Sequence, residues 1–196
     1  MSVATAPLRL VRTPVASGFS RKVRSISPSP AIALRSATAA DAEAIHTLIT
    51  EHLAEGHLLP RRREEIAVRA ARFVVAMQGD RMVACGELAP LSRTVAEVRS
   101  LVVSAGARST GVGRRIVDEL QQRATRAGFE KVCAFTHSPA YFVHMGFSIV
   151  PHEWLPEKIT TDCSSCAQFR QCGQYAVVHT LARVRHACVP LTSLHG

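Results

Sequence analysis

The sequence predicts a single α/β domain in which a central mixed, mostly antiparallel and twisted sheet is flanked by helices. Three observations support this fold class. Apolar residues make up 47% of the 196 residues, which is enough to bury a core of ordinary size. Short β-branched runs bounded by turn residues alternate with segments of helical periodicity. One such run, residues 98–103, leads through a glycine-rich turn into a long amphipathic segment, as a strand followed by a helix would.

Two helices are expected before the first long strand. Thr38, followed three residues later by Asp41, resembles a capping box with a shorter acid and predicts a helix over residues 39–53. Pro60 disfavours helix in the residue before it, so an extended connector follows. The next helix is expected over residues 62–71.

Three strands are expected to form an antiparallel meander. The apolar runs at residues 73–77 and 82–88 flank a polar turn that contains Gly79, which predicts a hairpin. A third strand over residues 95–103 completes the meander.

The second half of the chain predicts a parallel crossover. Apolar residues recur at three- and four-residue spacings from Val112 to Ala127, and Gly128 ends this helix as a C-terminal cap. The connection to the next strand, residues 131–135, is long enough for a right-handed crossover. The remaining expected elements are a short helix and two strands, at residues 139–145, 147–150 and 176–181.

Charge is distributed unevenly along the chain. We divide the chain into a basic tail (1–33), a folded domain (34–182) and a C-terminal tail (183–196). The formal net charge is +9, but the first 40 residues hold six of the 24 Lys and Arg and none of the 15 Asp and Glu. The rest therefore carries only +3, and it lacks a basic stripe interleaved with aromatic residues, so we do not expect nucleic acid as a partner.

Composition also bears on location. No stretch approaches the roughly 18 to 20 apolar residues of a membrane helix, so we expect a soluble, cytoplasmic protein with no membrane partner. The first 35 residues are rich in Ser, Pro and Arg; disorder is the simpler explanation, and an organelle transit peptide shares this composition. Cys85 and Cys133 fall inside predicted strands, where reduced, buried thiols are common.

Three further cysteines are closely spaced. Cys163, Cys166 and Cys172 could bind a structural zinc ion, with His179 or Cys188 as the fourth ligand. Only one Cys-x-x-Cys pair is present, so free thiols or a disulfide are equally compatible.

The glycine-rich turn predicts a site for a pyrophosphate. Gly111 and Gly113 allow the backbone to approach an anion closely at the point where a helix begins. The free amides of the helix start, the positive end of its dipole and the side chain of Arg108 would then face one bound group.

The spacing Arg108-x-x-Gly111-x-Gly113 after a strand resembles the coenzyme A loop of the GCN5-related N-acetyltransferase (GNAT) family. Tyr141 and a Gly-Phe pair at 146–147 match a second family motif in the expected order. The resemblance implies the GNAT fold, in which strands splay beside the cofactor, with acetyl-CoA as co-substrate. It assigns the pantetheine arm and the pyrophosphate to Leu101, Val102, Val103, Arg108, Ser109, Thr110, Gly111, Val112, Gly113 and Arg114.

Two residues are candidates for proton transfer. The resemblance places Tyr141 where a phenol protonates the coenzyme A sulfur, while packing of the short helix is the alternative role. Glu97 is a candidate base that would act through water on the ammonium substrate, and an exposed carboxylate at the strand edge is the alternative. His137 and His144 lie nearby, where structural roles are the commoner ones.

The acceptor is predicted by a second resemblance. The segment at residues 58–61 resembles the substrate loop of N-acetylglutamate synthases, and the strands at 83–91 and 96–101 resemble those that follow it there. A short form of that family lacks the kinase-like half and matches this chain in length. It implies acetylation of the α-amine of L-glutamate, the first step of arginine biosynthesis.

Guanidinium groups hold carboxylates in a fixed orientation, so Arg61 and Arg99 are the candidate ligands for the two carboxylates of glutamate. The resemblance adds Leu59 and Cys85 as pocket residues, and it implies that a homodimer is an option. Alternatives are a GNAT enzyme that acts on another amine, such as a protein N-terminus, and a non-catalytic module that binds acetyl-CoA.

Overall fold

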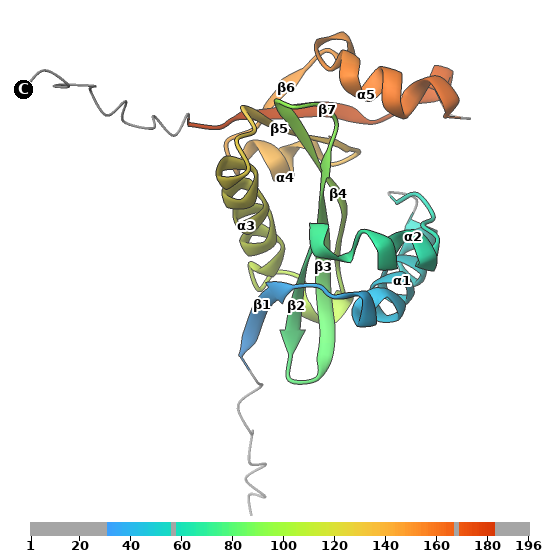
Figure 1. Ribbon diagram of the computed structural model, residues 1–196, viewed down its shortest axis with the longest axis vertical. Helices are drawn as coiled ribbons and strands as arrows, with labels where there is room; N and C mark the ends of the chain where they lie inside the picture. Colours follow the sequence, from blue (N-terminus) through green and yellow to red (C-terminus); the bar gives the residue numbers. More distant parts are fainter. Residues whose placement is uncertain (1–30, 56–57, 167–168, 183–196) are drawn as a thin grey trace, which may run out of the picture.

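The computed structural model describes residues 31–55, 58–166 and 169–182. Within them lies one seven-stranded sheet in the order β1-β2-β3-β4-β5-β7-β6 (Figure 1). All neighbouring strands are antiparallel except β4 and β5, which are parallel. The strands are β1 (Ile32–Ser36), β2 (Phe73–Gln78), β3 (Arg81–Pro90), β4 (Val95–Val103), β5 (Lys131–Thr136), β6 (Ser148–Val150) and β7 (Tyr175–Thr180).

Helices cover both faces of this sheet. In Figure 1, α3 lies on the opposite side of β1–β4 from α1 and α2. Ile116 and Leu120 of α3 are fully buried in one core cluster, and Ile45, Ile49 and Ile66 of α1 and α2 are buried in the other. The α-helices are α1 (Ala42–Glu51), α2 (Arg63–Val68), α3 (Val112–Arg126), α4 (Pro139–Val143) and α5 (Pro156–Thr161).

The predicted fold class is therefore confirmed, as are the meander of β2, β3 and β4 and the parallel crossover through α3. The strand expected over 95–103 has those bounds. Gly128 follows α3 with a φ of +84°, the left-handed conformation of a helix C-cap. The amide of Thr38 donates to Asp41 Oδ2 at 2.7 Å, which is one half of the predicted capping box.

Some boundaries differ from the prediction. Strand β1 was not predicted, and it pairs with β2 along its whole length. The first predicted helix is a 3-10 turn (Ala39–Asp41) followed by α1, and the second is shortened to α2. Helix α5 was not predicted, because its six residues are too few to show a periodic pattern. The predictions for both tails fall on residues 1–30 and 183–196, which lie outside the described residues.

Two regions of the sheet position the site. Strands β4 and β5 pair only through three residues, from Val95↔Lys131 to Glu97↔Cys133, and then diverge. Just beyond this point the β3–β4 register shifts by one residue, and Ser100 has a φ of +47°. A bulge of this kind bends a strand and interrupts its ladder. The sheet is thus opened where β4 leaves β5.

Candidate active site

A large cavity occupies this opening between the strands. Its volume is about 1180 Å³, and it is lined by β4 from Glu97 to Val103, the loop before α3, α4, α5 and the connector at residues 58–61. The cavity has two chemically different ends. The end beside α3 presents backbone and glycine, and the end beside α2 and α5 presents charged side chains.

The loop end has the geometry that the sequence predicts for an anion site. Gly111 is the N-cap of α3 with a φ of +79°, a conformation that side chains with a Cβ rarely adopt. A Cβ built there would meet nothing within 4 Å, so the space beside this residue is open. Gly111, Val112 and Gly113 all line the cavity. The free amides of a 15-residue helix therefore start at its wall.

Other residues of the loop hold its shape. Thr110 Oγ1 donates to the carbonyl of Ala107 at 2.7 Å, and Arg108 Nε donates to the carbonyl of Val103 at 3.2 Å. The guanidinium of Arg108 also pairs with Glu55 across the cavity mouth. Both of these side chains are about half exposed, so an arriving anion could compete for Arg108 at low cost.

Tyr141 reaches from α4 to the start of α3. A Cβ added to Gly113 would lie 2.5 Å from the Tyr141 hydroxyl oxygen, so the phenol packs directly on that glycine. Its ring meets Phe142 edge to face with centroids 5.5 Å apart. Burial raises the pKa of Tyr141, which keeps the phenol protonated at neutral pH. The residue thus packs the short helix and also presents a hydroxyl to the cavity.

Arg61 stands at the charged end. Its Nη1 donates to Glu87 Oε2 at 2.9 Å and to Ser100 Oγ at 3.2 Å, and its Nη2 donates to Glu65 Oε1 at 3.0 Å. Glu87 is fully buried, and its other oxygen has no hydrogen-bond partner among the residues that the structure describes. Arg61 therefore shares its two terminal nitrogens between a core carboxylate and one at the surface.

Arg99 is held in a similar way. Its Nε donates to Glu97, and its Nη2 donates to Asp162. Lys158 of α5 lies between the same two acids, with Nζ 2.7 Å from Glu97 Oε1 and 2.9 Å from Asp162 Oδ2. Glu97 is 3% exposed, rather than an exposed carboxylate at the strand edge. Both of its oxygens already accept hydrogen bonds from cations.

The two other predicted pocket residues differ in their exposure. Leu59 lines the cavity and is 64% exposed. Cys85 is fully buried in the core cluster that α1 and α2 cover, and it is absent from the cavity wall. Its Sγ donates to the carbonyl of Ser100 at 3.6 Å, so it contacts the site from beneath the bulge. Burial raises the pKa of this thiol to about 12, which keeps it neutral.

Sequence reasoning gave no role to several residues of this end. Signals for them existed: Glu87 is an acid inside an apolar strand, and Lys158 and Asp162 have the i, i+4 spacing of a helical ion pair. The contacts themselves join segments that are far apart in the chain. The residues are Glu65, Glu87, Ser100, Lys158 and Asp162.

The cysteine segment lies beside this end. Cys166 lines the cavity, and Cys163, Cys166 and Cys172 are all free thiols. Within the described ranges, no three His, Cys, Asp or Glu side chains gather in a way that could hold a metal ion. The fourth ligands proposed for zinc include Cys188, which lies outside those ranges.

A splayed α/β sheet with a glycine-capped helix start beside its opening is typical of enzymes that bind a nucleotide and transfer an acyl group. Residues 42–147 match the model of the acetyltransferase (GNAT) family, and the chain belongs to this family. Membership confirms the predicted fold and the use of acetyl-CoA as co-substrate.

Relatives of known sequence refine this assignment. The chain is 31% identical over 154 residues to an uncharacterized N-acetyltransferase of Chlorobaculum tepidum, an alignment that spans 79% of this chain and 99% of that protein. It is 28% identical over 127 residues to the amino-acid acetyltransferase of Pectobacterium carotovorum, across 64% of this chain. That alignment covers only 29% of the Pectobacterium protein.

Solved structures share this fold. N-acetylglutamate synthase from Neisseria gonorrhoeae, complexed with coenzyme A and N-acetyl-glutamate, has a TM-score of 0.71 at 24% identity over 78% of this chain and 36% of that one. Rv2747 from Mycobacterium tuberculosis, in complex with CoA and NLQ, has a TM-score of 0.65 at 25% identity over 76% and 99%.

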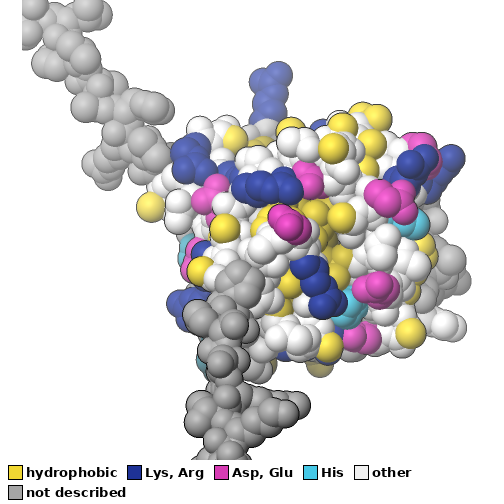
Figure 2. Space-filling model, turned by 90° about the horizontal axis from the view of Figure 1, so that it is seen from below, with side chains coloured by type: hydrophobic (Ala, Val, Ile, Leu, Met, Phe, Trp, Pro, Cys, Tyr) yellow, Lys and Arg dark blue, Asp and Glu magenta, His cyan; other side chains and the backbone are white. Residues whose placement is uncertain are grey.

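Two other expectations concern surfaces. None of the described helices is long and apolar enough to cross a membrane. Figure 2 shows one face of the molecule, on which basic, acidic and apolar side chains are interspersed rather than gathered by charge.

Proposed function

We propose that this acetyltransferase transfers the acetyl group of acetyl-CoA to the α-amino group of L-glutamate, as in the first step of arginine biosynthesis. The observation that carries the proposal is the pair of guanidinium groups, Arg61 and Arg99, on the wall of the charged end of the cavity. Both are largely buried, and arginine is the side chain best suited to hold carboxylates in a fixed geometry. The similarity to amino-acid acetyltransferases supports the same substrate class.

The residues of the loop end fit the co-substrate. The start of α3, from Gly111 to Gly113, would hold the pyrophosphate through backbone amides, with Arg108 and Arg114 at the mouth of the cavity. The cavity wall between the loop and the point where β4 leaves β5 includes Leu101, Val102 and Val103. These residues would contact the pantetheine arm. Acetyl-CoA, when bound, supplies the acetyl group as a thioester.

The acceptor amine would then enter from the side of Leu59 and Arg61. Because β4 and β5 separate after Glu97, an amino acid held at the charged end lies in the same cavity as the end of the pantetheine path. Holding two reactants in one geometry removes much of the entropic cost of their encounter. The arginines therefore position the amine, and other residues transfer the protons during the chemical step.

The substrate ammonium loses two protons as it becomes the amide nitrogen, and the departing sulfur gains one, so one proton is released overall. We assign protonation of the sulfur to Tyr141, whose neutral hydroxyl lies beside Gly113 and whose proton is restored through water by the second proton of the nitrogen. For the first proton of the ammonium, Glu97 stays our candidate base, acting through water. Because Lys158 and Arg99 bind both of its oxygens, it also fixes those two cations.

Coenzyme A release, measured with acetyl-CoA and each of the twenty amino acids, tests this function. We expect turnover with glutamate, or with glutamate and glutamine, because both have the α-carboxylate and a side chain of the same length. Turnover with a peptide N-terminus and none with amino acids would favour the alternative acceptor. Binding of acetyl-CoA without turnover of any amine would favour a non-catalytic module. We further place the enzyme in the cytoplasm, where fractionation of the native cells can test it.

A further inference from the structure

The charged end of the cavity contains two ion-pair units of the same design. In each unit one arginine bonds two carboxylates, of which one is buried and the other is at the surface. Arg61 bonds Glu87, which is 0% exposed, and Glu65, which is 35% exposed. Arg99 bonds Glu97, which is 4% exposed, and Asp162, which is 34% exposed.

The buried carboxylates are held more firmly by their arginines. Separating a buried charge from its partner is strongly unfavourable. Without Arg61, Glu87 would lose the one ion pair that the described residues give it, and without Arg99, Glu97 would keep only Lys158. Glu87 and Glu97 thus fix one nitrogen of Arg61 and Arg99, and Lys158 supports Glu97 with two further hydrogen bonds.

The surface carboxylates are different. Glu65 and Asp162 are each about one-third exposed, and each has a second cation besides its arginine. Arg69 Nη1 lies 2.7 Å from Glu65 Oε1, and Lys158 Nζ lies 2.9 Å from Asp162 Oδ2. Either acid can therefore leave its arginine, turn toward water and keep a partner. Their departure would leave one nitrogen of each arginine directed into the cavity and still held by its buried partner.

Charge balance favours their departure when a dicarboxylate binds. Among the described residues at this end, four cations (Arg61, Arg69, Arg99 and Lys158) face four carboxylates. Two more carboxylates and one ammonium from glutamate would leave six negative groups against five positive ones. If Glu65 withdraws together with Arg69 and Asp162 withdraws as well, four groups of each sign remain, which is the arrangement that Coulomb attraction favours.

We propose that Glu65 and Asp162 are surrogate ligands, which occupy the places of the two substrate carboxylates in the free enzyme and are displaced by them. This inference rests on the proposed function, and it makes both acids determinants of acceptor affinity. They keep the arginines oriented before the substrate arrives, and they weaken the binding of any ligand that cannot replace both of them.

The sign of a mutational effect separates this role from its alternatives. A competitor that is removed makes substrate binding stronger, so Glu65→Gln and Asp162→Asn should each lower the KM for L-glutamate by about twofold to fivefold, the weight of a partly exposed ion pair. The KM for acetyl-CoA should not change. If either acid instead held the substrate ammonium, its loss would raise the KM for glutamate.

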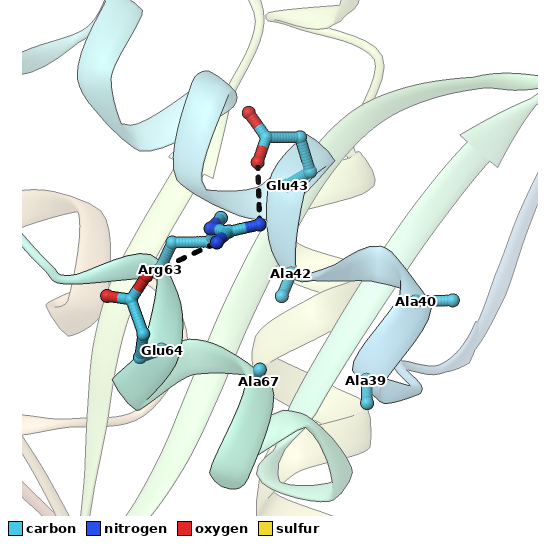
Figure 3. A pocket seen from close by; sticks show the side chains of 7 residues that line it. All are labelled: Ala39, Ala40, Ala42, Glu43, Arg63, Glu64 and Ala67. Atoms are coloured by element: carbon cyan, nitrogen blue, oxygen red, sulfur yellow. Dashed lines mark hydrogen bonds and ion pairs between the residues drawn. The ribbon is translucent and has the colours of Figure 1, made fainter.

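The chain offers a matched control beside Glu65. Figure 3 shows Glu64 on the same helix, where it joins Arg63 and Glu43 at a shallow pocket lined by alanines of α1, α2 and the 3-10 turn before α1. That pocket shares no lining residue with the catalytic cavity. Glu64→Gln therefore removes an acid and an ion pair from α2 without touching either arginine of the site, and it should leave both KM values unchanged.

Glutamine separates the two units. It keeps the α-carboxylate and replaces the side-chain carboxylate by an amide, so only one of the two variants should lower its KM. That variant identifies the arginine that binds the α-carboxylate. The other unit then binds the side-chain carboxylate and sets the preference for glutamate.

A binding measurement without turnover completes the test. Glutarate carries two carboxylates and no amine, and it should raise the melting temperature of each variant more than that of the wild type, with each ligand-free protein as its own reference. Because each protein is compared with its own ligand-free form, the test stays valid for a variant whose basal stability has fallen. Absence of glutamate acetylation by the wild type would reject the proposed function but not the surrogate role, which the glutarate shifts still report. Equal or smaller glutarate shifts in both variants, or a raised KM for glutamate, would overturn the inference.

Discussion

The two ends of the cavity are formed by different chemical groups. The loop end uses backbone amides, two glycines and the start of α3, all within a few residues of one another. The charged end uses side chains from the connector after residue 58, α2, β3, β4 and α5. A backbone site accepts one kind of ligand and tolerates few substitutions, whereas a set of ion pairs can change its specificity one side chain at a time. This difference suits a family with one co-substrate and many acceptors.

Breaking the backbone end should have the largest effect. Gly111→Val places a β-branched residue at a φ of +79° and directs its side chain into the space beside the loop. Strain there costs about 1–3 kcal/mol, and the lost fit adds to it, so we expect the Kd for acetyl-CoA to rise about 100-fold. Isothermal titration calorimetry would measure it. Gly106→Val is the control, because this glycine of the same loop has open space and no positive φ. Equal affinities for acetyl-CoA in the two variants would show that Gly111 is not part of the pyrophosphate site.

Breaking the charged end should have the next largest effect, and on the other substrate. Arg99→Ala removes a cation while Lys158 still holds Glu97. A lost hydrogen bond between charged groups is worth about 1.5–3 kcal/mol, so the KM for glutamate should rise about 30-fold. The KM for acetyl-CoA should stay within about twofold. Steady-state kinetics with each substrate varied in turn would show this, and equal changes in both KM values would contradict the division of the cavity.

The same comparison explains how much could be predicted from the sequence. The meander of β2, β3 and β4 and the crossover through α3 depend on local patterns, such as the apolar stripe of α3, and these were predicted correctly. The role of the loop end as an anion site stays a prediction. The partners of Arg61 and Arg99 depend on contacts between segments as far apart as Arg99 and Asp162, and no local pattern gives these. Strand β1 was not predicted, because it has only five residues and follows a tail of similar composition.

Tyr141 packs on Gly113 at the loop end, and removal of its hydroxyl should affect the chemical step alone. Tyr141→Phe keeps the ring that packs on Phe142 and deletes only the hydroxyl near Gly113. We expect kcat to fall about tenfold, less than a fully enclosed acid would give, because the partly exposed site admits water. Both KM values and the melting temperature should be unchanged. If Tyr141→Phe had the kcat of the wild type, the phenol would have only a packing role.

The raised pKa of Tyr141 adds a pH dependence to this test. Because burial favours the neutral phenol, the acid form persists to higher pH than it would for an exposed tyrosine. The alkaline loss of kcat that depends on Tyr141 should therefore begin above the ordinary phenol pKa of about 10. The pH profile of the wild type minus that of Tyr141→Phe would isolate it, and a loss near neutrality in both proteins would have to come from another group.

The smallest effect is expected for Arg108, the exposed arginine of the loop end. Arg108 is about half exposed and pairs with Glu55 at the mouth of the cavity, so its charge is screened by solvent. Arg108→Ala should raise the KM for acetyl-CoA about threefold at low ionic strength, and the difference from wild type should shrink in 0.5 M salt, where the Debye length is only about 4 Å. Arg126→Ala, on the exposed last turn of α3, is the matched control. A defect that persists at high salt would mean that Arg108 acts through its hydrogen bond to the carbonyl of Val103, as a brace of the loop rather than as a ligand of the phosphates.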